Sequence, residues 1–296
     1  MPAHASHLRP AAPDTSTGAA PLRVGIQGYA GAFHESAARR YYGEDYAVSI
    51  VPGHTFADVV ERLESGGSDT ALMAIENTLA GSLMQNYHLL QEADLRVVGE
   101  VYLRIRQNLM ALPGVELHEL REVYSHPIAL MQCREFFGRW PRITLIEDAD
   151  TALSARDVLE SGDRTRGAVA SSTAAELYGL EILAPSIETN KLNHTRFLVL
   201  ERGREVDFGR GDKVSLSFST EHASGSLMRV LTVLAAYDVN LTKIQSTPIV
   251  GRPWQYRFYV DFVVEGAVDT KTALEAIAPI TTELRVLGVY ASGEKP

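Results

Sequence analysis

Short apolar runs alternate with amphipathic helical patterns from Leu22 to about residue 200, and this alternation constrains the fold more than any other feature of the sequence. In its first part the expected strands are LRVGIQG, YAVSIVPG and TALMAIEN, and the expected helices are AFHESAARRYYG and HTFADVVERLESGG. A turn at Gly28 and Gly31 leads from the first strand into the first helix. Strands that alternate with helices are typical of an α/β sheet with crossover helices, so this part predicts one lobe.

The same pattern continues and predicts a second lobe. We interpret VVGEVYLRIRQNLMAL as one extended strand, followed by the units EVYSHPIALMQCREFFGRW, RITLIED with TALSARDVLESG, and GAVAS with STAAELYG. The strand NHTRFLVL has no helix after it and would return to the first lobe. The expected fold is therefore a two-lobed, periplasmic-binding-protein-like (type II) α/β domain. A cleft between lobes is the usual ligand site of such a sheet.

The composition excludes several classes of protein. The 296 residues with 45% hydrophobic content can form two cores, so we expect a cytoplasmic protein of two domains. A net charge of -9 and a pI near 5.5 offer nucleic acid no basic surface. Cys133, the one cysteine, excludes an intramolecular disulfide and is expected to be a small apolar helix residue. Residues 1–21 are expected to form a disordered tail, and no run is long enough to span a membrane.

Polar residues follow the third expected strand. Glu76 and Asn77 end this strand, and Gly81 with Ser82 is expected to open the next helix. The first N–H groups of a helix have no partner within it, so backbone donors would lie beside a carboxylate. Such a corner suits an anionic ligand and a proton.

Two further corners have the same character. Pro127 suits the first position of a helix, with Ser125 or His126 as its cap and Gln132 further inside. Residues 171–173 form a hydroxyl-rich helix start. Because serine and threonine before helices are chiefly caps, each corner alone says little about function.

Thr195 opens the apolar run of NHTRFLVL. A threonine at this place is most often a good β-former, so its chemical role depends on what lies around it. On a strand, Arg196 would point to the opposite face and Phe197 would return to the face of Thr195. A structural ion pair is therefore about as reasonable for Arg196 as a bidentate carboxylate clamp.

Four segments resemble the signature blocks of the prephenate dehydratase family, in the family's order: IENTLAG, YSHPIALMQC, ASSTAAELYGLEIL and NHTRFLVL. GYAGAFHESAA is similar to the family's glycine-rich opening block, with Ala32 where a hydroxyl residue is usual. The resemblance implies that prephenate loses its ring hydroxyl as water and its ring carboxylate as carbon dioxide. Because the product ring is aromatic, no metal or organic cofactor is needed, only a proton donor and a grip on a dianion.

The resemblance also implies roles for individual residues. Thr195 is similar to the threonine that donates a proton or hydrogen bond to the departing hydroxyl, and Glu76 is the nearest candidate for the proton source. The expected catalytic group is Thr195, Glu76, Asn77, Ser125 and Gln132. The expected substrate-binding group is Gly81, Ser82, Ser171, Ser172, Thr173, Arg196 and Phe197.

The C-terminal part resembles an ACT domain, a regulatory module that binds small molecules. KVSLSFST, GSLMRVLTVLAAYDV, NLTKIQSTPIV, YRFYVDFVVEG, DTKTALEAIAPI and ELRVLGVYAS have the ferredoxin-like order of strand, helix, two strands, helix and strand. Where the family usually has Glu-Ser-Arg-Pro, this chain has Gln245, Ser246, Thr247 and Pro248. The expected division is a tail (1–21), a catalytic domain (22–204), a linker (205–212), the ACT domain (213–291) and a second tail (292–296).

The resemblance implies feedback by L-phenylalanine and a homodimer or homotetramer, because paired ferredoxin-like units can bury a ligand between them. The expected effector contacts are Gly225, Ser226, Leu227, Met228, Asn240, Leu241 and Thr242. The alternative for this domain is a purely structural role. For the whole chain the alternatives are an arogenate dehydratase, and a ligand sensor on the same fold that binds without reacting.

Overall fold

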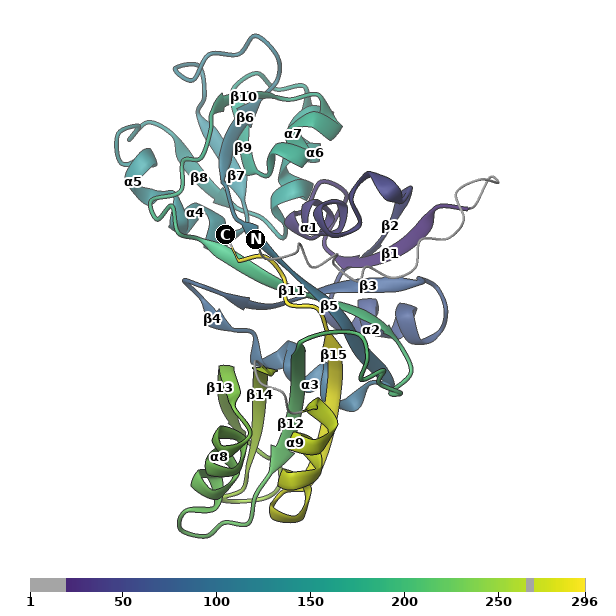
Figure 1. Ribbon diagram of the computed structural model, residues 1–296. Helices are drawn as coiled ribbons and strands as arrows, with labels where there is room; N and C mark the ends of the chain where they lie inside the picture. The colour runs from purple at the N-terminus through teal and green to yellow at the C-terminus, as the bar shows by residue number, and fades with distance from the viewer. Residues whose placement is uncertain (1–19, 265–268, 296) are drawn as a thin grey trace, which may run out of the picture. The chain divides into compact units, whose positions relative to one another are not determined.

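The computed structural model describes residues 20–264 and 269–295, which divide into two compact units (Figure 1). The N-terminal unit contains residues 20–83 and 101–197, and the C-terminal unit contains residues 84–100 and 198–294. Strands β5 (Leu95–Arg104) and β11 (His194–Arg202) contribute residues to both units. The N-terminal tail, residues 1–21, is predicted to be disordered. Residues 1–19 lie outside the part of the chain that the structure describes. The predicted domain boundaries stay a prediction.

The first lobe of the N-terminal unit is built on one sheet. Its strands have the order β5-β11-β3-β1-β2, with β1 parallel to β2 and β3. The elements are β1 (Leu22–Gln27), α1 (Phe33–Tyr42), a 3-10 turn (Gly43–Asp45), β2 (Val48–Gly53), α2 (Phe56–Glu64), β3 (Thr70–Asn77) and β4 (Gly81–Ser82). Gly28 and Gly31 have φ of +99° and +88°, a conformation that favours glycine, and they form the predicted turn into α1. β11 lies beside β3, so the predicted return strand is confirmed.

The second lobe has its own five-stranded sheet, in the order β10-β6-β9-β7-β8. Its elements are β6 (Asn108–Ala111), β7 (Glu122–Ser125), α4 (Pro127–Gln132), α5 (Arg134–Phe137), β8 (Thr144–Glu147), α6 (Thr151–Ser161), β9 (Arg166–Ala170), α7 (Ser172–Tyr178) and β10 (Glu181–Ala184). Helices α6 and α7 lie on one side of this sheet, and α4 and α5 lie on the other (Figure 1). Cys133 is buried in the core with Val123 and Val169, and burial raises its thiol pKa to about 12. The small apolar role expected for Cys133 is confirmed, but the residue lies between α4 and α5 and not within a helix.

The prediction of one strand over VVGEVYLRIRQNLMAL is wrong. This segment forms β5 and β6, which belong to different sheets. The break falls at residues 105–107, where Ile105 N donates to Asn193 O at 2.8 Å and Gln107 N donates to the Glu188 carboxylate at 2.9 Å. Because these two N–H groups bond to partners outside both sheets, neither sheet continues through residues 105–107. The chain passes from one lobe to the other here.

The predicted helix start at Gly81 and Ser82 is also wrong. These residues form β4, which pairs antiparallel with Asn77 and Glu76. The helix that follows, α3 (Met84–Glu92), begins two residues beyond Ser82. Because β4 folds back on β3, the predicted N–H donors of a helix start do not lie beside Glu76.

The C-terminal unit contains the predicted ferredoxin-like arrangement. Its elements after β11 are β12 (Lys213–Ser219), α8 (Ser226–Ala236), β13 (Val239–Pro248), β14 (Tyr256–Val264), α9 (Thr270–Ile277), a 3-10 turn (Ala278–Ile280) and β15 (Thr282–Tyr290). The strand order is β13-β14-β12-β15, with β12 antiparallel to both neighbours. Helices α8 and α9 lie side by side on one face (Figure 1), over a core that includes Leu216, Val230 and Phe262. The predicted fold of this part is confirmed.

The sheet of the C-terminal unit continues from β15 into β5, which is parallel to it. Helix α3 packs through Tyr87, whose ring lies 4.8 Å from that of Tyr259. A buried ion pair joins β12 to β5, because Lys213 Nζ lies 2.8 Å from both carboxylate oxygens of Glu100.

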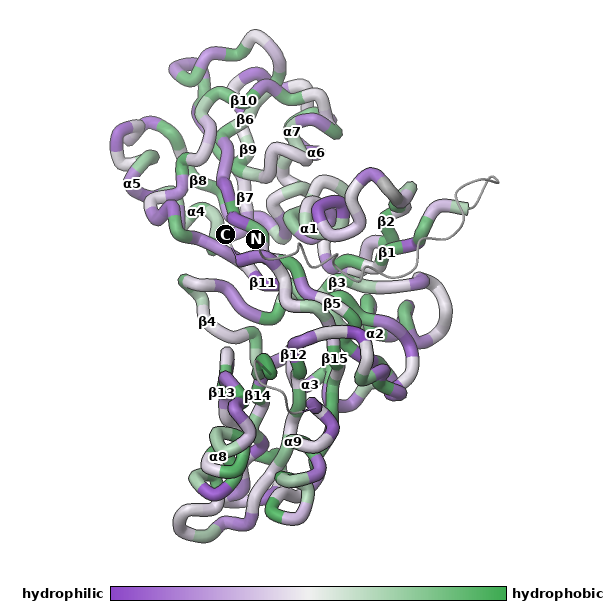
Figure 2. Tube along the Cα trace, in the orientation of Figure 1, coloured by the Kyte–Doolittle hydropathy of each residue, from purple (hydrophilic) through white to green (hydrophobic). Residues whose placement is uncertain are grey.

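Hydrophobic residues follow the strands of both units. Figure 2 shows apolar runs along β3 and β15, with hydrophilic residues interspersed along α9. Within residues 20–264 and 269–295, no helix combines the length and the apolar character needed to cross a membrane.

Candidate active site

A cavity of about 350 Å³ lies in the N-terminal unit, and both lobes contribute to its wall. The first lobe contributes the start of α1, the end of β3 and residues of β11, and the second lobe contributes α4 and the start of α6. The polar lining residues are Gln27, His34, Asn77, Gln107, His126, Gln132, Asp150, Thr151, Asn193 and Thr195. The cavity therefore lies where the sequence predicts the ligand cleft.

Thr195 lines this cavity, and Asn77 determines how its hydroxyl can bond. Asn77 Nδ2 donates to Thr195 Oγ1 at 2.9 Å, while Asn77 Oδ1 accepts from the backbone N–H groups of Leu79 and Ala80, both at 2.9 Å. Since those two N–H groups hold the amide oxygen, the NH₂ group must face Thr195. The Thr195 oxygen acts as an acceptor towards Asn77, so its own O–H can donate to a group in the cavity.

A chain of neutral amides extends from this pair towards the second lobe. Asn77 Nδ2 also donates to Asn193 Oδ1 at 2.8 Å, and Asn193 Nδ2 donates to Gln132 Oε1 at 3.0 Å. Gln107 Nε2 approaches the same Gln132 oxygen at 3.4 Å. The structure thus places two residues of the predicted catalytic group, Asn77 and Gln132, in one hydrogen-bonded chain with Thr195.

The predicted serine corners bond to backbone atoms. Ser125 is fully buried, and its Oγ donates to Val169 O at 2.6 Å, which joins β7 to β9. Ser171 Oγ donates to Gly31 O at 2.6 Å and accepts from Ala174 N at 3.0 Å, so it caps α7 and ties that helix to the first lobe. These hydrogen bonds give both serine side chains a structural role. Neither serine belongs to the described cavity lining.

The neighbours of Ser171 also lie away from the cavity wall. Thr173 Oγ1 lies 2.8 Å from Ser36 Oγ of α1, and Ser172 is exposed. The Thr173–Ser36 bond is a second tie between the two lobes. In the part of the chain that the structure describes, Ser172 and Thr173 are not among the cavity-lining residues.

Glu76 and Arg196 are not brought to the cavity either. Among the described residues that line it, Asn77 is present but Glu76 is not, and the Glu76 backbone pairs with Ser82. Arg196 is buried at 5% exposure between Thr195 and Phe197, both of which line the cavity. This alternation places the Arg196 side chain on the other face of β11. Their predicted roles in catalysis and binding stay predictions.

Phe197 lines the cavity on the same face as Thr195, as expected from the period of a strand. Its ring meets His34 edge to face, with ring centroids 4.9 Å apart. His34 is 9% exposed, and burial lowers its pKa to about 4, so its imidazole is neutral near pH 7.

His34, Gln107 and Asp150 are among the polar lining residues to which the sequence alone assigned no role. His34 follows the glycine turn, Gln107 lies between two strands, and Asp150 precedes an expected helix, which it caps by accepting from Ala152 N at 2.8 Å. Burial raises the Asp150 pKa. The cap pattern could have identified Asp150, whereas periodicity carries no signal for the other two.

The cavity is poor in formal positive charge. Within the described lining there is no lysine or arginine, and Asp150 is the one acidic residue. The start of α1 contributes partial positive charge, because its N-cap residue Ala32 makes no side-chain cap and lines the cavity. Anionic groups of a ligand would therefore be bound mainly by neutral donors.

A second cavity, of about 260 Å³, lies at the start of α8 in the C-terminal unit. Four predicted effector residues line it: Gly225, Ser226, Leu227 and Met228. Trp254 and Tyr256 also line it, and Trp254 is 74% exposed. The other three predicted residues, Asn240, Leu241 and Thr242, belong to the start of β13 and are not in the described lining.

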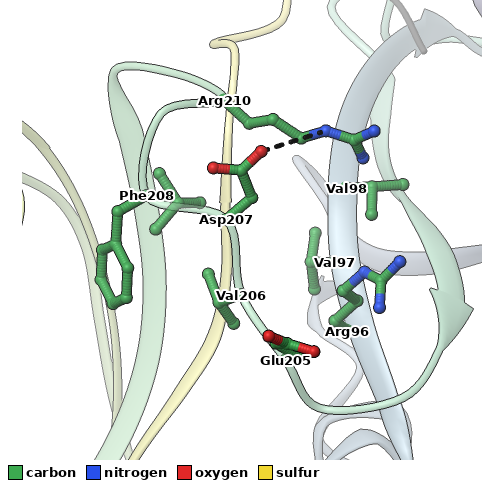
Figure 3. Close-up of a pocket in the computed structure, with 9 residues that line it drawn as sticks. Arg96, Val97, Val98, Glu205, Val206, Asp207, Phe208 and Arg210 are labelled. Atoms are coloured by element: carbon green, nitrogen blue, oxygen red, sulfur yellow. Dashed lines mark ion pairs between the residues drawn. The ribbon is translucent and has the colours of Figure 1, made fainter. Parts of the chain in front are cut away.

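A third cavity, of about 450 Å³, is also part of the C-terminal unit. Its wall comes from residues 96–98 of β5, from residues 205–208, and from Arg210 and Val289. Figure 3 shows Asp207 and Arg210 directed towards one another, with 3.9 Å between the paired atoms. Arg96 is paired with Glu201 at 2.7 Å. Both arginines of this cavity are therefore paired within the unit.

Comparison with known proteins agrees with the fold. The solved structure of prephenate dehydratase from Arthrobacter aurescens, in complex with L-Phe, has a TM-score of 0.79 at 28% identity, covering 91% of this chain and 90% of that chain. A solved structure described as a novel type of quorum quenching acylase has a TM-score of 0.82 at 31% identity, covering 91% and 98%. The molecule is thus a two-lobed α/β protein with a ferredoxin-like unit.

The sequence comparisons identify the family. Residues 24–205 match the family description of prephenate dehydratase. Arogenate dehydratase/prephenate dehydratase 2 of Arabidopsis thaliana is 39% identical over 282 residues, covering 91% of this chain and 72% of that protein. The chain belongs to the prephenate dehydratase family, whose members are dehydratase lyases. The family resemblance seen in the sequence is confirmed, and assignment of the C-terminal part as an ACT domain stays a prediction.

Proposed function

We propose that this chain converts prephenate to phenylpyruvate, water and carbon dioxide in L-phenylalanine biosynthesis. The observation that carries the proposal is the Thr195 hydroxyl, which accepts from Asn77 at 2.9 Å and can therefore donate to a ligand. Family membership supports the class of reaction. The cavity supports a small polar substrate, because its wall combines the neutral amide chain with the Phe197 ring.

The reaction consumes one proton. The carbon–oxygen bond to the ring hydroxyl breaks, and the hydroxyl leaves as water. The carbon–carbon bond to the ring carboxylate also breaks, its electron pair completes the aromatic ring, and carbon dioxide leaves. Thr195 stabilises the charge that grows on the leaving oxygen.

A threonine hydroxyl is too weak an acid to be the ultimate proton source. Glu76 is the predicted source but is not in the described cavity lining, whereas Asp150 lines the cavity and is a second candidate source. The raised pKa of Asp150 favours its protonated form, which a general acid requires.

Arogenate is the second candidate substrate, because the Arabidopsis thaliana relative carries both dehydratase names. The purified protein should be incubated with each compound while phenylpyruvate and phenylalanine are measured separately. Formation of phenylpyruvate from prephenate supports the main proposal. Binding of both compounds without turnover would instead support the ligand sensor.

We also propose that L-phenylalanine binds the C-terminal unit and lowers activity. The cavity at Gly225 to Met228 supports this, as does the Arthrobacter aurescens structure in complex with L-Phe. A homodimer or homotetramer and a cytoplasmic location remain predictions. Calorimetric titration with L-phenylalanine, next to activity at rising effector concentration, tests the proposal. Absence of both effects at millimolar ligand would leave the domain a structural role.

A further inference from the structure

The direction of the amide chain in the cavity is set by two backbone groups. The N–H groups of Leu79 and Ala80 hold Asn77 Oδ1, so Asn77 must donate through Nδ2 to Asn193 Oδ1 at 2.8 Å. Asn193 then presents its own NH₂ group to Gln132 Oε1 at 3.0 Å. Each amide thus fixes the orientation of the next, because an amide oxygen can only accept and an NH₂ group can only donate.

This direction determines which atom of Gln107 remains unpaired. Gln107 Nε2 faces the Gln132 oxygen at 3.4 Å, so Gln107 Oε1 is at the other side of the amide. Gln107 is 3% exposed and lines the cavity, and its Oε1 has no hydrogen-bond partner among the described residues. A buried acceptor without a partner is unfavourable, and a ligand that donates to it relieves that penalty.

The two candidate substrates differ at one side-chain group, and an unpaired acceptor can discriminate between the two forms of that group. Prephenate has a keto carbonyl in its side chain and a net charge of about -2, whereas arogenate has an ammonium group there and a net charge of about -1 near pH 7. An ammonium N–H donates to an amide oxygen, while a keto oxygen is repelled by it. The described lining also contains neither lysine nor arginine, which favours the less negative substrate.

We propose that Gln107 is a specificity-determining residue, whose Oε1 accepts a hydrogen bond from the ammonium group of arogenate and so makes arogenate a substrate of this chain. The proposal rests on the proposed dehydratase function of the same cavity. His34 Nε2 is also buried and without a partner among the described residues, but a neutral imidazole nitrogen donates or accepts according to its tautomer. Of these two unpartnered atoms, Gln107 Oε1 is therefore the one that discriminates between the two side chains.

The test measures kcat/KM for arogenate and for prephenate, and uses their ratio. Gln107→Met removes the acceptor at similar volume and should lower the ratio of arogenate to prephenate about tenfold to a hundredfold, the range for a hydrogen bond to a charged group. Gln107→Glu places a carboxylate there and should raise the ratio, because it attracts the ammonium group and repels the keto acid. The loss should appear mainly in KM, since the ammonium group is bound before and during reaction.

Gln27→Met is the matched control. Gln27 lines the same cavity, but its amide is held at the surface, where Nε2 donates to His54 O at 3.4 Å. This substitution should change both rates in proportion and leave the ratio unaltered. If Gln107→Met does not fold, as judged by thermal unfolding, the sign of the Gln107→Glu effect decides alone.

The outcomes separate this inference from the function on which it rests. A wild-type protein that converts neither compound contradicts the proposed function. A wild-type protein that converts prephenate but not arogenate overturns the role of Gln107 and leaves the proposed function intact. A ratio that Gln107→Glu lowers or leaves unchanged also overturns it.

Discussion

The cavities proposed for substrate and for effector hold their groups in different ways. In the substrate cavity, Thr195 and Asn193 are buried at 8% and 0% exposure and belong to a hydrogen-bonded chain that begins at backbone N–H groups. In the effector cavity, Met228 and Trp254 are 66% and 74% exposed. Catalysis requires groups held before the substrate arrives. A regulatory site can instead leave apolar surface for the ligand, or a second copy of the chain, to cover.

The largest expected effect is at Thr195. Thr195→Ala should reduce kcat about a hundredfold to ten-thousandfold, roughly 3 to 5 kcal/mol, because the leaving oxygen loses its donor. Thr195→Ser keeps the hydroxyl and should retain much more activity. Steady-state kinetics on folded protein measures both. A folded Thr195→Ala protein with normal turnover would show that prior organisation of this hydroxyl does not matter.

Asn77→Asp should have the next largest effect, about thirtyfold to a hundredfold in kcat, or roughly 2 to 3 kcal/mol. The carboxylate still accepts from Leu79 N and Ala80 N, but its other oxygen now accepts from Thr195. The Thr195 O–H then points away from the substrate. Kinetics with prephenate measures this, and Asn77→Ala is the comparison because it leaves the hydroxyl free to turn. Equal activity of Asn77→Asp and the wild type contradicts the orientation argument.

Burial of neutral His34 should make stability depend on pH. Its pKa of about 4 lies below the usual histidine pKa of 6.5, so the unfolded chain binds the extra proton first and stability falls as the pH drops from 6.5 towards 4. Between pH 7 and pH 5 the loss from this residue is about 2 kcal/mol. Urea unfolding at both pH values should show this loss in the wild type and a smaller one in His34→Gln. The same loss in both proteins contradicts it.

The smallest expected effect is at the effector cavity. Met228→Asp should weaken L-phenylalanine binding about tenfold, or 1.4 kcal/mol, because it removes exposed apolar surface and repels the ligand carboxylate. Calorimetric titration measures the affinity. Thr232→Asp, one turn further along α8 and exposed, is the matched control. Unchanged affinity of the Met228 variant would place the effector elsewhere.

Local patterns predicted most elements of both units, and two of the segments that they misassigned show why the others were missed. Residues 105–107, between β5 and β6, include neither glycine nor proline, so the local sequence carries no sign of the break there, where tertiary bonds to Asn193 and Glu188 replace the ladder. Gly81 and Ser82 look like a helix start, but pairing with β3 holds them as a strand. In the first case partners distant in sequence decide the conformation, and in the second case the pairing within a short hairpin decides it.

The candidate site was predicted in part. Thr195, Asn77, Gln132 and Phe197 line one cavity, and three of the four belonged to the predicted catalytic group. Ser125 and Ser171 were expected at the ligand but bond to Val169 O and Gly31 O, which no local pattern reveals. A serine before a helix has the same sequence signature whether its hydroxyl meets a ligand or a backbone carbonyl.

The sequence by itself determined the family, the two-lobed α/β fold and the ferredoxin-like part, because these depend on periodicity and on motifs that are contiguous in the chain. It also determined Thr195 as a candidate, through the block NHTRFLVL. Only the tertiary structure decided the direction of the hydrogen bonds that reach Thr195 and Gln107. That direction begins at Leu79 N and Ala80 N and passes through side chains more than a hundred residues apart. Hydrogen-bond polarity is a property of neighbouring atoms in space, and no periodicity along the chain encodes it.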